Sequence, residues 1–162
     1  MAGRPVSYDR DAVVDGAMVE FWARGFMTSD VEQLTQAAGL NRHSLYKRFG
    51  GKRSLFLEAL RRYVDEVAAA YVAMLESGTG LDDLLAYFER ISGAQGQADD
   101  LAPQGFDHRG CFLVNTAIEL GRTDPDVAAL LDAYYARIEE GFAGLIRRGQ
   151  EAGTIRGDLD PQ

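Results

Sequence analysis

Apolar residues recur every three or four positions along most of this chain, and that helical periodicity constrains its fold more than any other feature. No run of alternating β-branched residues predicts a strand, and no motif repeats at a fixed period. The 162 residues suffice for one ordinary domain, or for a small module fused to a larger one. We therefore expect an all-α protein whose helices are separated by turns that contain glycine.

The N-terminal part is expected to contain three helices. The first spans about 9–24, and its apolar face comprises Val14, Ala17, Met18, Phe21 and Trp22. Ser29 and Glu32 have the spacing of a capping box, which predicts the start of a second, short helix. Asn41 is a suitable cap for a third helix, which ends before a pair of glycines.

Longer helices are expected after the glycine pair. A helix over 52–76 bridges two parts of the protein, and a shorter one follows over about 82–91. The polar, glycine-containing stretch 93–104 is expected to form a loop. Residues 111–120 are nearly all apolar, which predicts a helix buried on most of its sides. The last helix, with an Asp-Pro start, is expected over 125–152.

Charge is distributed unevenly along the chain. The net charge is −8, which by itself argues against nucleic acid as a partner. Residues 1–64, however, hold ten basic and seven acidic residues, and residues 39–62 hold seven basic residues and one acid. A segment of charge +6 in an acidic protein suggests a basic binding face on a body that otherwise repels polyanions.

Composition excludes several classes of protein. No apolar run approaches the ~18 residues of a membrane span, and the N-terminus lacks the apolar stretch of a signal peptide. We therefore expect a cytoplasmic protein without a membrane partner. The single cysteine, Cys111, makes neither an intramolecular disulfide nor, by itself, a zinc site, so we expect no metal and no cofactor. Its apolar neighbours favour a buried, inert thiol over a redox sensor.

A histidine with charged neighbours, in the stretch Asp107-His108-Arg109, suggests a catalytic group at first sight. The only other histidine is His43, and the spacing identifies no serine, cysteine or carboxylate as a partner for either of them. We therefore expect a protein that is not an enzyme.

Two short helices joined by a turn that contains Gly39 form a helix-turn-helix, which reads DNA when its second helix enters the major groove. With its apolar residues turned inward, that second helix exposes His43, Ser44, Lys47 and Arg48. Lysine and arginine suit phosphates or guanine, and serine or histidine can hydrogen-bond to base edges. The alternative is a helix pair in an ordinary bundle with a solvated basic face.

A more specific pattern lies in the same region. It comprises Gly25-Phe26, Leu34-Thr35-Gln36-Ala37-Ala38-Gly39-Leu40 and Ser44-Leu45-Tyr46-Lys47-Arg48-Phe49-Gly50-Gly51-Lys52. This pattern resembles the DNA-binding domain of the TetR family of bacterial transcriptional repressors, and the resemblance covers residues 9–64. The stretch 109–115 and the helix after Pro125 are similar to the ligand-binding domains of one branch of that family.

The resemblance implies a DNA-binding domain over 1–51 and a helical domain over 52–162 that binds an effector and forms a dimer. Lys52 would hold a phosphate at the start of the long helix, where a helix N-terminus and an ammonium both favour an anion. His43 stands where the family often has glycine, so base reading at that position is not carried over. The expected DNA-binding residues are Ser29, Arg42, His43, Ser44, Tyr46, Lys47, Arg48 and Lys52.

Polar residues on the apolar helix 111–120 suggest a ligand pocket with apolar walls and few polar groups. The expected lining comprises Tyr71, Phe88, Phe112, Asn115, Thr116, Glu119 and Tyr134. The alternative is that the aromatic residues belong to the core and that the polar residues make structural hydrogen bonds there. A small apolar molecule is the expected effector.

A short recognition helix contacts few base pairs, so useful specificity requires two copies that read two half-sites. We expect a homodimer formed through the apolar stripe of the last helix. The expected interface residues are Val127, Leu130, Leu131, Tyr134, Ile138, Phe142 and Leu145. Many members of the family continue past Asp160-Pro161 with another helix of a dimerising bundle, and we expect the C-terminal domain to lack that helix because the sequence ends at Gln162.

The leading hypothesis is therefore a transcriptional repressor that binds double-stranded operator DNA and is released by a small-molecule ligand. The alternatives are a constitutive DNA-binding regulator without an inducer and an interaction module that has lost DNA binding. Control by an effector is expected to pass through the helix 52–76, because it is the only predicted element that contacts both parts of the protein.

Overall fold

The computed structural model describes residues 9–92 and 109–161 of the chain. Over these residues the protein is helical and contains no β-strand, in agreement with the sequence periodicity. The helices are α1 (Arg10–Arg24), α2 (Val31–Ala37), α3 (Arg42–Phe49), α4 (Lys52–Tyr63), η1 (Val64–Ala68), α5 (Ala69–Ser77), α6 (Leu81–Ser92), α7 (Phe112–Leu120) and α8 (Pro125–Glu151). The stretch 93–104, expected to form a loop, lies outside the described residues. None of these helices is long and apolar enough to cross a membrane.

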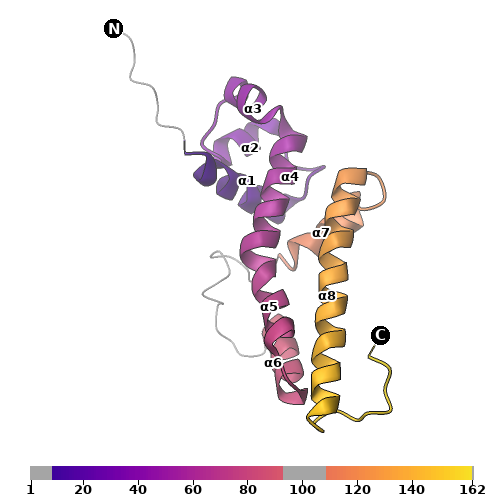
Figure 1. Ribbon diagram of the computed structural model, residues 1–162. Helices are drawn as coiled ribbons and strands as arrows, with labels where there is room; N and C mark the ends of the chain where they lie inside the picture. Colours follow the sequence, from indigo (N-terminus) through magenta and orange to yellow (C-terminus); the bar gives the residue numbers. More distant parts are fainter. Residues whose placement is uncertain (1–8, 93–108, 162) are drawn as a thin grey trace.

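Helices α1, α2 and α3 pack with the start of α4 around a shared apolar core (Figure 1). Asp9 caps α1 by accepting hydrogen bonds from the backbone N–H groups of Asp11 and Ala12. The ring of Phe21 meets the ring of Phe56 edge-on, with 5.0 Å between the centroids, and both side chains are fully buried. This core fixes the three N-terminal helices to the long helix that follows them.

The start of α2 differs from the expectation by one residue. Asp30, rather than Ser29, is the N-cap, because its Oδ1 accepts a hydrogen bond of 2.7 Å from the backbone N–H of Gln33. Asn41 caps α3 as predicted, and accepts a bond of 2.8 Å from the N–H of Ser44. Serine and aspartate are both favourable caps, so the residue types alone could not decide between two neighbours.

Helices α4, η1 and α5 form one continuous rod that runs beside α8 (Figure 1). The rod confirms the long helix expected over 52–76, but its middle, η1, is π-helical. Tyr63, just before this turn, and Val67, inside it, are both buried, so the inward face of the rod continues through it. Single π-helical turns inside longer helices are rare and frequently occur near functional sites.

The apolar stripe of α8 lies inside the protein. Asp124 caps this helix as predicted by accepting hydrogen bonds from the N–H groups of Asp126 and Val127. The stripe expected to form the dimer interface is buried in the core or packed against it, and comprises Val127, Leu130, Leu131, Tyr134, Ile138, Phe142 and Leu145. The predicted interface is therefore corrected, because α5, α6 and α7 of the same chain pack against α8 and cover this stripe.

Helices α6 and α7 expose more apolar surface than predicted. On α6, Tyr87 is buried, whereas Leu85 and Phe88 are 51% and 53% exposed. On α7, Val114 is 46% and Ile118 is 82% exposed, so this helix is not buried on most of its sides. An apolar composition predicts a helix that packs against something, but it does not identify the faces that neighbouring helices cover.

Candidate nucleic-acid interface

Helices α2 and α3 form a helix-turn-helix at one end of the molecule (Figure 1). The turn between them contains Gly39 with φ of +62°, a left-handed conformation that glycine adopts without strain. Leu45 and Phe49 are buried and anchor α3 to the bundle. The opposite side of α3 is therefore open to solvent.

Basic and polar side chains occupy the open side of α3. The exposed residues are Arg42, His43, Tyr46, Lys47 and Arg48, and Ser44 is half-buried. The first turn of α3 carries no acidic residue, and neither Arg42 nor Lys47 forms an ion pair with any residue in the described ranges. This side of α3 thus presents cations and hydrogen-bonding groups of the kinds that contact phosphates and base edges.

Lys52 lies at the N-terminus of α4, directly after the glycine pair. Gly51 is the N-cap and offers no side-chain hydrogen bond, so the first N–H groups of α4 are open to an anion. The Nζ atom of Lys52 lies 4.5 Å from the centroid of the Phe26 ring. Partial burial lowers the pKa of Lys52, and the nearby carboxylates of Glu119 and Asp30 oppose this shift.

Ser29 does not belong to this exposed surface. It is 1% exposed, and its hydroxyl donates a hydrogen bond of 2.7 Å to the carbonyl of Gly25. The predicted phosphate contact of Ser29 is therefore corrected, because its side chain faces into the protein. Its neighbours Thr28 and Asp30 are exposed instead.

Glu119 joins α7 to the turn between α1 and α2. Its Oε2 accepts a hydrogen bond of 2.8 Å from the backbone N–H of Phe26, and its Oε1 accepts one of 2.7 Å from the N–H of Met27. The sequence suggested that Glu119 lines a ligand pocket. The structure corrects this prediction, because both carboxylate oxygens accept backbone N–H groups of the N-terminal part of the chain.

Two further contacts link elements that are distant in the sequence. Arg53, in the first turn of the long helix, donates hydrogen bonds to Asp124 and Asp126 at the start of α8. The indole Nε1 of Trp22 donates a bond of 2.8 Å to the carbonyl of Gly110. Because Trp22 and the turn bound by Glu119 contact the C-terminal part directly, the long helix is not the only element that contacts both parts. No local pattern in the sequence links these distant residues, so the sequence analysis missed the contacts.

The residues expected to line a ligand pocket do not all come together. Phe88 is exposed, and so is Asn115, whose amide donates a hydrogen bond of 2.7 Å to the carbonyl of Arg109. Phe112 is buried in the main core. Thr116 is 1% exposed, and its Oγ1 has no hydrogen-bond partner among the described residues. Thr116 is therefore a buried polar group that the visible protein does not satisfy.

Tyrosine side chains gather around Cys111 in the C-terminal part. The hydroxyl of Tyr63 lies 3.8 Å from the Sγ atom of Cys111, and the rings of Tyr71 and Tyr87 meet edge-on with 6.2 Å between centroids. Burial, with a contribution from Cys111, raises the pKa of Tyr134. Tyr87 was not predicted here, although its spacing from Leu84 places it near the inward face of α6. Across the described ranges, no group of histidine, cysteine and acidic residues could hold a metal ion.

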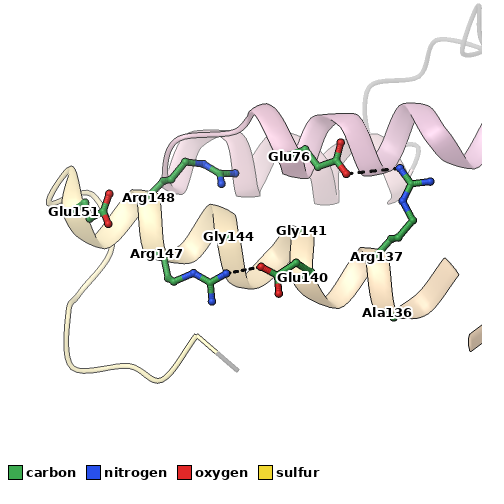
Figure 2. Close-up of a pocket in the computed structure, with 9 residues that line it drawn as sticks. All are labelled: Glu76, Ala136, Arg137, Glu140, Gly141, Gly144, Arg147, Arg148 and Glu151. Atoms are coloured by element: carbon green, nitrogen blue, oxygen red, sulfur yellow. Dashed lines mark hydrogen bonds and ion pairs between the residues drawn. The ribbon is translucent and has the colours of Figure 1, made fainter. Parts of the chain in front are cut away.

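A groove of about 580 Å³ runs along α8 where it faces α5 (Figure 2). Charged residues line it together with alanine and glycine. Arg137 of α8 pairs with Glu76 of α5 at 3.7 Å, and Arg147 pairs with Glu140 along α8 at 2.7 Å. None of the residues expected to line the ligand pocket lies in this groove. It is an open, charged surface feature rather than an apolar pocket.

A three-helix bundle that exposes the basic second helix of a helix-turn-helix, carried on a helical body, defines the class of helix-turn-helix DNA-binding proteins. The family model of bacterial regulatory proteins, tetR family, matches residues 13–59. The model of the tetracyclin repressor-like C-terminal domain matches residues 80–162. The chain belongs to the TetR family of bacterial regulators, and its function is DNA-binding transcriptional regulation.

Named relatives and solved structures agree with this assignment. The chain is 32% identical to the HTH-type transcriptional repressor ComR of Escherichia coli strain K12, over 94% of this chain and 70% of ComR. It is 27% identical to the repressor DhaR of Mycobacterium sp. strain GP1, over 99% of this chain and 75% of DhaR. A cysteine-substituted TetR family regulator, CifR, solved with 26-bp double-strand operator DNA, is 30% identical with a TM-score of 0.71, over 98% of this chain and 80% of that one. These findings confirm the predicted family, the all-helical fold and a regulator rather than an enzyme.

Proposed function

We propose that this protein is a repressor that binds operator DNA as a homodimer and leaves it when a small molecule binds the C-terminal part. The exposed basic side of α3 is the observation that carries the DNA-binding half of this proposal. ComR and DhaR are both named repressors, which supports repression over activation. Residues 1–51 then form the reading domain, and residues 52–162 form the effector and dimerisation domain.

The contacts with DNA divide into two kinds. Arg42 and Ser44 stand at the start of α3, the end that enters the major groove in a helix-turn-helix, and they read base edges together with Tyr46 and His43. Lys47, Arg48 and Lys52 contact phosphates, and the open N–H groups of α4 support the last of these contacts. Ser29 is not part of this proposed set.

The homodimer follows from the eight-residue length of α3, because one such helix reads few base pairs. We place the dimer contact on the exposed side of α8, which carries Ala129, Ala133 and Ala136. These small side chains allow a second helix to approach closely. Two copies would then read half-sites ~34–36 Å apart or a multiple of that distance.

Sedimentation equilibrium at micromolar concentration tests the dimer. The wild type should sediment with twice the monomer mass, and Ala133→Arg should shift it to the monomer because a large charged side chain blocks the approach. Ala86→Arg places the same substitution at an exposed position of α6 and should leave the dimer intact. A monomeric wild type would contradict the proposal.

The proposed effector site lies in the C-terminal part, around Tyr71, Phe112, Thr116 and Tyr134. Buried and partly buried aromatic side chains and one buried hydroxyl without a partner in the described ranges favour a small, mostly apolar molecule that accepts or donates a single hydrogen bond. A thermal-shift screen of small apolar compounds should identify ligands that raise the melting temperature of the wild type. A screen without such a ligand would favour the alternative, a constitutive regulator without an inducer.

Sequencing the genomic DNA fragments that the purified protein retains would test the whole proposal. We expect a small set of fragments with a shared, two-fold symmetric sequence, and their release by any ligand from the thermal-shift screen. Retention of no fragment would favour an interaction module that has lost DNA binding.

A further inference from the structure

We infer that Glu119 is a positioning residue for DNA binding: its carboxylate holds the turn between α1 and α2 on α7, and thereby sets the orientation of the helix-turn-helix. The residue acts through this turn and has no contact with DNA in the inference. Its effect on DNA affinity rests on the proposed homodimer, because the orientation of the helix-turn-helix matters most when two copies must bind two half-sites at the same time.

The contact between Glu119 and the turn consists of two short hydrogen bonds to an ionised carboxylate. Both carboxylate oxygens accept backbone N–H groups, from Phe26 at 2.8 Å and from Met27 at 2.7 Å. Hydrogen bonds to an ionised acceptor are roughly twice as strong as those between neutral groups. The side chain of Met27 is 69% exposed, whereas Phe26 packs against the core beside Phe56. Packing therefore holds one side of the turn, and Glu119 binds its backbone to α7.

Gly25 makes room for this carboxylate. It has a φ of +81°, and a Cβ atom built at this position would lie 3.0 Å from Oε2 of Glu119. A glycine is thus needed both for the backbone conformation and for the close approach. Gly25 and Glu119 lie more than ninety positions apart in the sequence, and both residue types are required for this contact. This requirement indicates a specific contact between the two parts of the protein.

The turn bound by Glu119 lies next to the helix-turn-helix formed by α2 and α3. It leads into Asp30, which caps α2, and α2 is followed directly by the turn to α3. Within the described ranges, no other side chain of the C-terminal part hydrogen-bonds to residues 26–28. Without the Glu119 contact, the three N-terminal helices are held less firmly against α7, and the two recognition helices of a dimer lose their fixed spacing.

Electrostatics predicts the opposite sign, which makes the inference testable. Glu119 is close enough to Lys52 to influence its pKa, so removal of this negative charge makes the surface near the DNA more basic. A more basic surface binds polyanions more tightly and without regard to sequence. A fall in specific affinity after this change would therefore come from lost positioning and not from lost charge.

The experiment compares two duplexes at one salt concentration. The first is a symmetric duplex selected from a random-sequence library with the wild-type protein, and the second is the same duplex with one half-site scrambled. Glu119→Gln keeps the shape of the side chain but offers an NH₂ group to one of the two N–H donors. We expect about tenfold weaker binding to the symmetric duplex, and binding within about twofold of wild type to the scrambled duplex.

Asp82→Asn is the matched control, since it removes one negative charge from an exposed position on α6, at the far end of the molecule from α3 (Figure 1). It should bind both duplexes as the wild type does. Wild-type or tighter binding of the symmetric duplex by Glu119→Gln would overturn the inference. A wild type that binds both duplexes equally would contradict the proposed dimer, and amide exchange would then decide the role of Glu119.

Amide hydrogen exchange measured by NMR reports on the contact without DNA. The N–H groups of Phe26 and Met27 should be protected in the wild type. In Glu119→Gln at least one of them should exchange at least about tenfold faster, because the amide keeps only one of the two acceptor oxygens and that oxygen is uncharged. The buried amide of Leu131 in α8 should be unaffected, which separates a local release from general unfolding. Equal exchange at Phe26 and Met27 in the two proteins would overturn the inference.

Discussion

Arg53, in the first turn of α4, donates two hydrogen bonds of 2.7 Å to Asp124, the residue that caps α8. The same carboxylate accepts the backbone N–H groups of Asp126 and Val127. Its side chain is only 15% exposed, so water competes little for these bonds. The carboxylate of Asp124 therefore joins α4 to the first turn of α8.

Replacement of this carboxylate should destabilise the protein. Asp124→Ala removes the cap of a 27-residue helix and leaves Arg53 with Asp126 alone, and we expect a loss of about 1–2 kcal/mol in the free energy of unfolding. Urea denaturation at neutral pH measures this loss. Asp132→Ala, an exposed position on the same helix, should change the value by less than about 0.5 kcal/mol. Equal losses in the two variants would contradict the dual role of Asp124.

The same residue should make stability depend on pH in the acid range. Hydrogen bonds from Arg53 hold the pKa of Asp124 below its ordinary value of 3.8, although burial opposes the shift. Because the folded pKa is the lower one, ionised Asp124 stabilises the fold fully above pH 3.8, and this contribution is lost as the pH falls through the folded pKa.

Urea titrations of wild type and Asp124→Asn at several pH values test this dependence. The difference between their free energies of unfolding should stay constant from about pH 5 to 8 and shrink below about pH 4. A difference that is unchanged down to about pH 3 would show that Asp124 has the same pKa in both states.

Lys47 should contribute to DNA affinity without reading sequence. Lys47→Ala removes one cation from the exposed side of α3, so specific and random DNA should both bind less tightly. The slope of log affinity against log salt concentration should shrink by about one unit. Arg147→Ala on α8, whose side chain pairs with Glu140, should leave the slope unchanged. A Lys47→Ala slope equal to that of wild type would remove this residue from the phosphate contacts.

Arg42 should instead carry sequence information. It is exposed at the first position of α3, from which a guanidinium can reach the edge of a base in the major groove. Arg42→Ala should cost about 1–3 kcal/mol on the selected operator and far less on random DNA. Competition binding between the two DNAs measures the difference. Equal losses on both would assign Arg42 to the phosphate backbone.

Removal of the hydroxyl of Thr116 should stabilise the protein. Its buried Oγ1 has no partner in the described ranges, so Thr116→Val should raise the free energy of unfolding by up to about 1 kcal/mol. Thr35→Val is the control with the opposite sign, because the hydroxyl of Thr35 donates a bond of 3.0 Å to the carbonyl of Glu32. Thermal denaturation ranks the two variants. Destabilisation by Thr116→Val would indicate that the hydroxyl of Thr116 forms a hydrogen bond with a group outside the described residues.

The parts of the structure that depend on neighbours in sequence were predictable. The caps Asn41 and Asp124, the inward direction of Leu45 and Phe49, and the exposed basic side of α3 follow from residue type and helical spacing alone. The family resemblance rests on the same local pattern. For this reason the sequence predicts the helix-turn-helix. It does not decide whether Ser29 or Asp30 caps α2, because both residue types are favourable caps.

Tertiary structure decided which surfaces are covered and which distant groups meet. The sequence identified an apolar stripe on the last helix, but only packing against the long rod made Leu131 a core residue instead of an interface residue. The sequence also marked Glu119 as an unusual polar residue on an apolar helix. Its partners lie more than ninety positions away, and hydrogen bonds of that kind leave no periodic signal. Helical spacing encodes contacts within a few residues, whereas contacts between helices depend on how the whole chain packs.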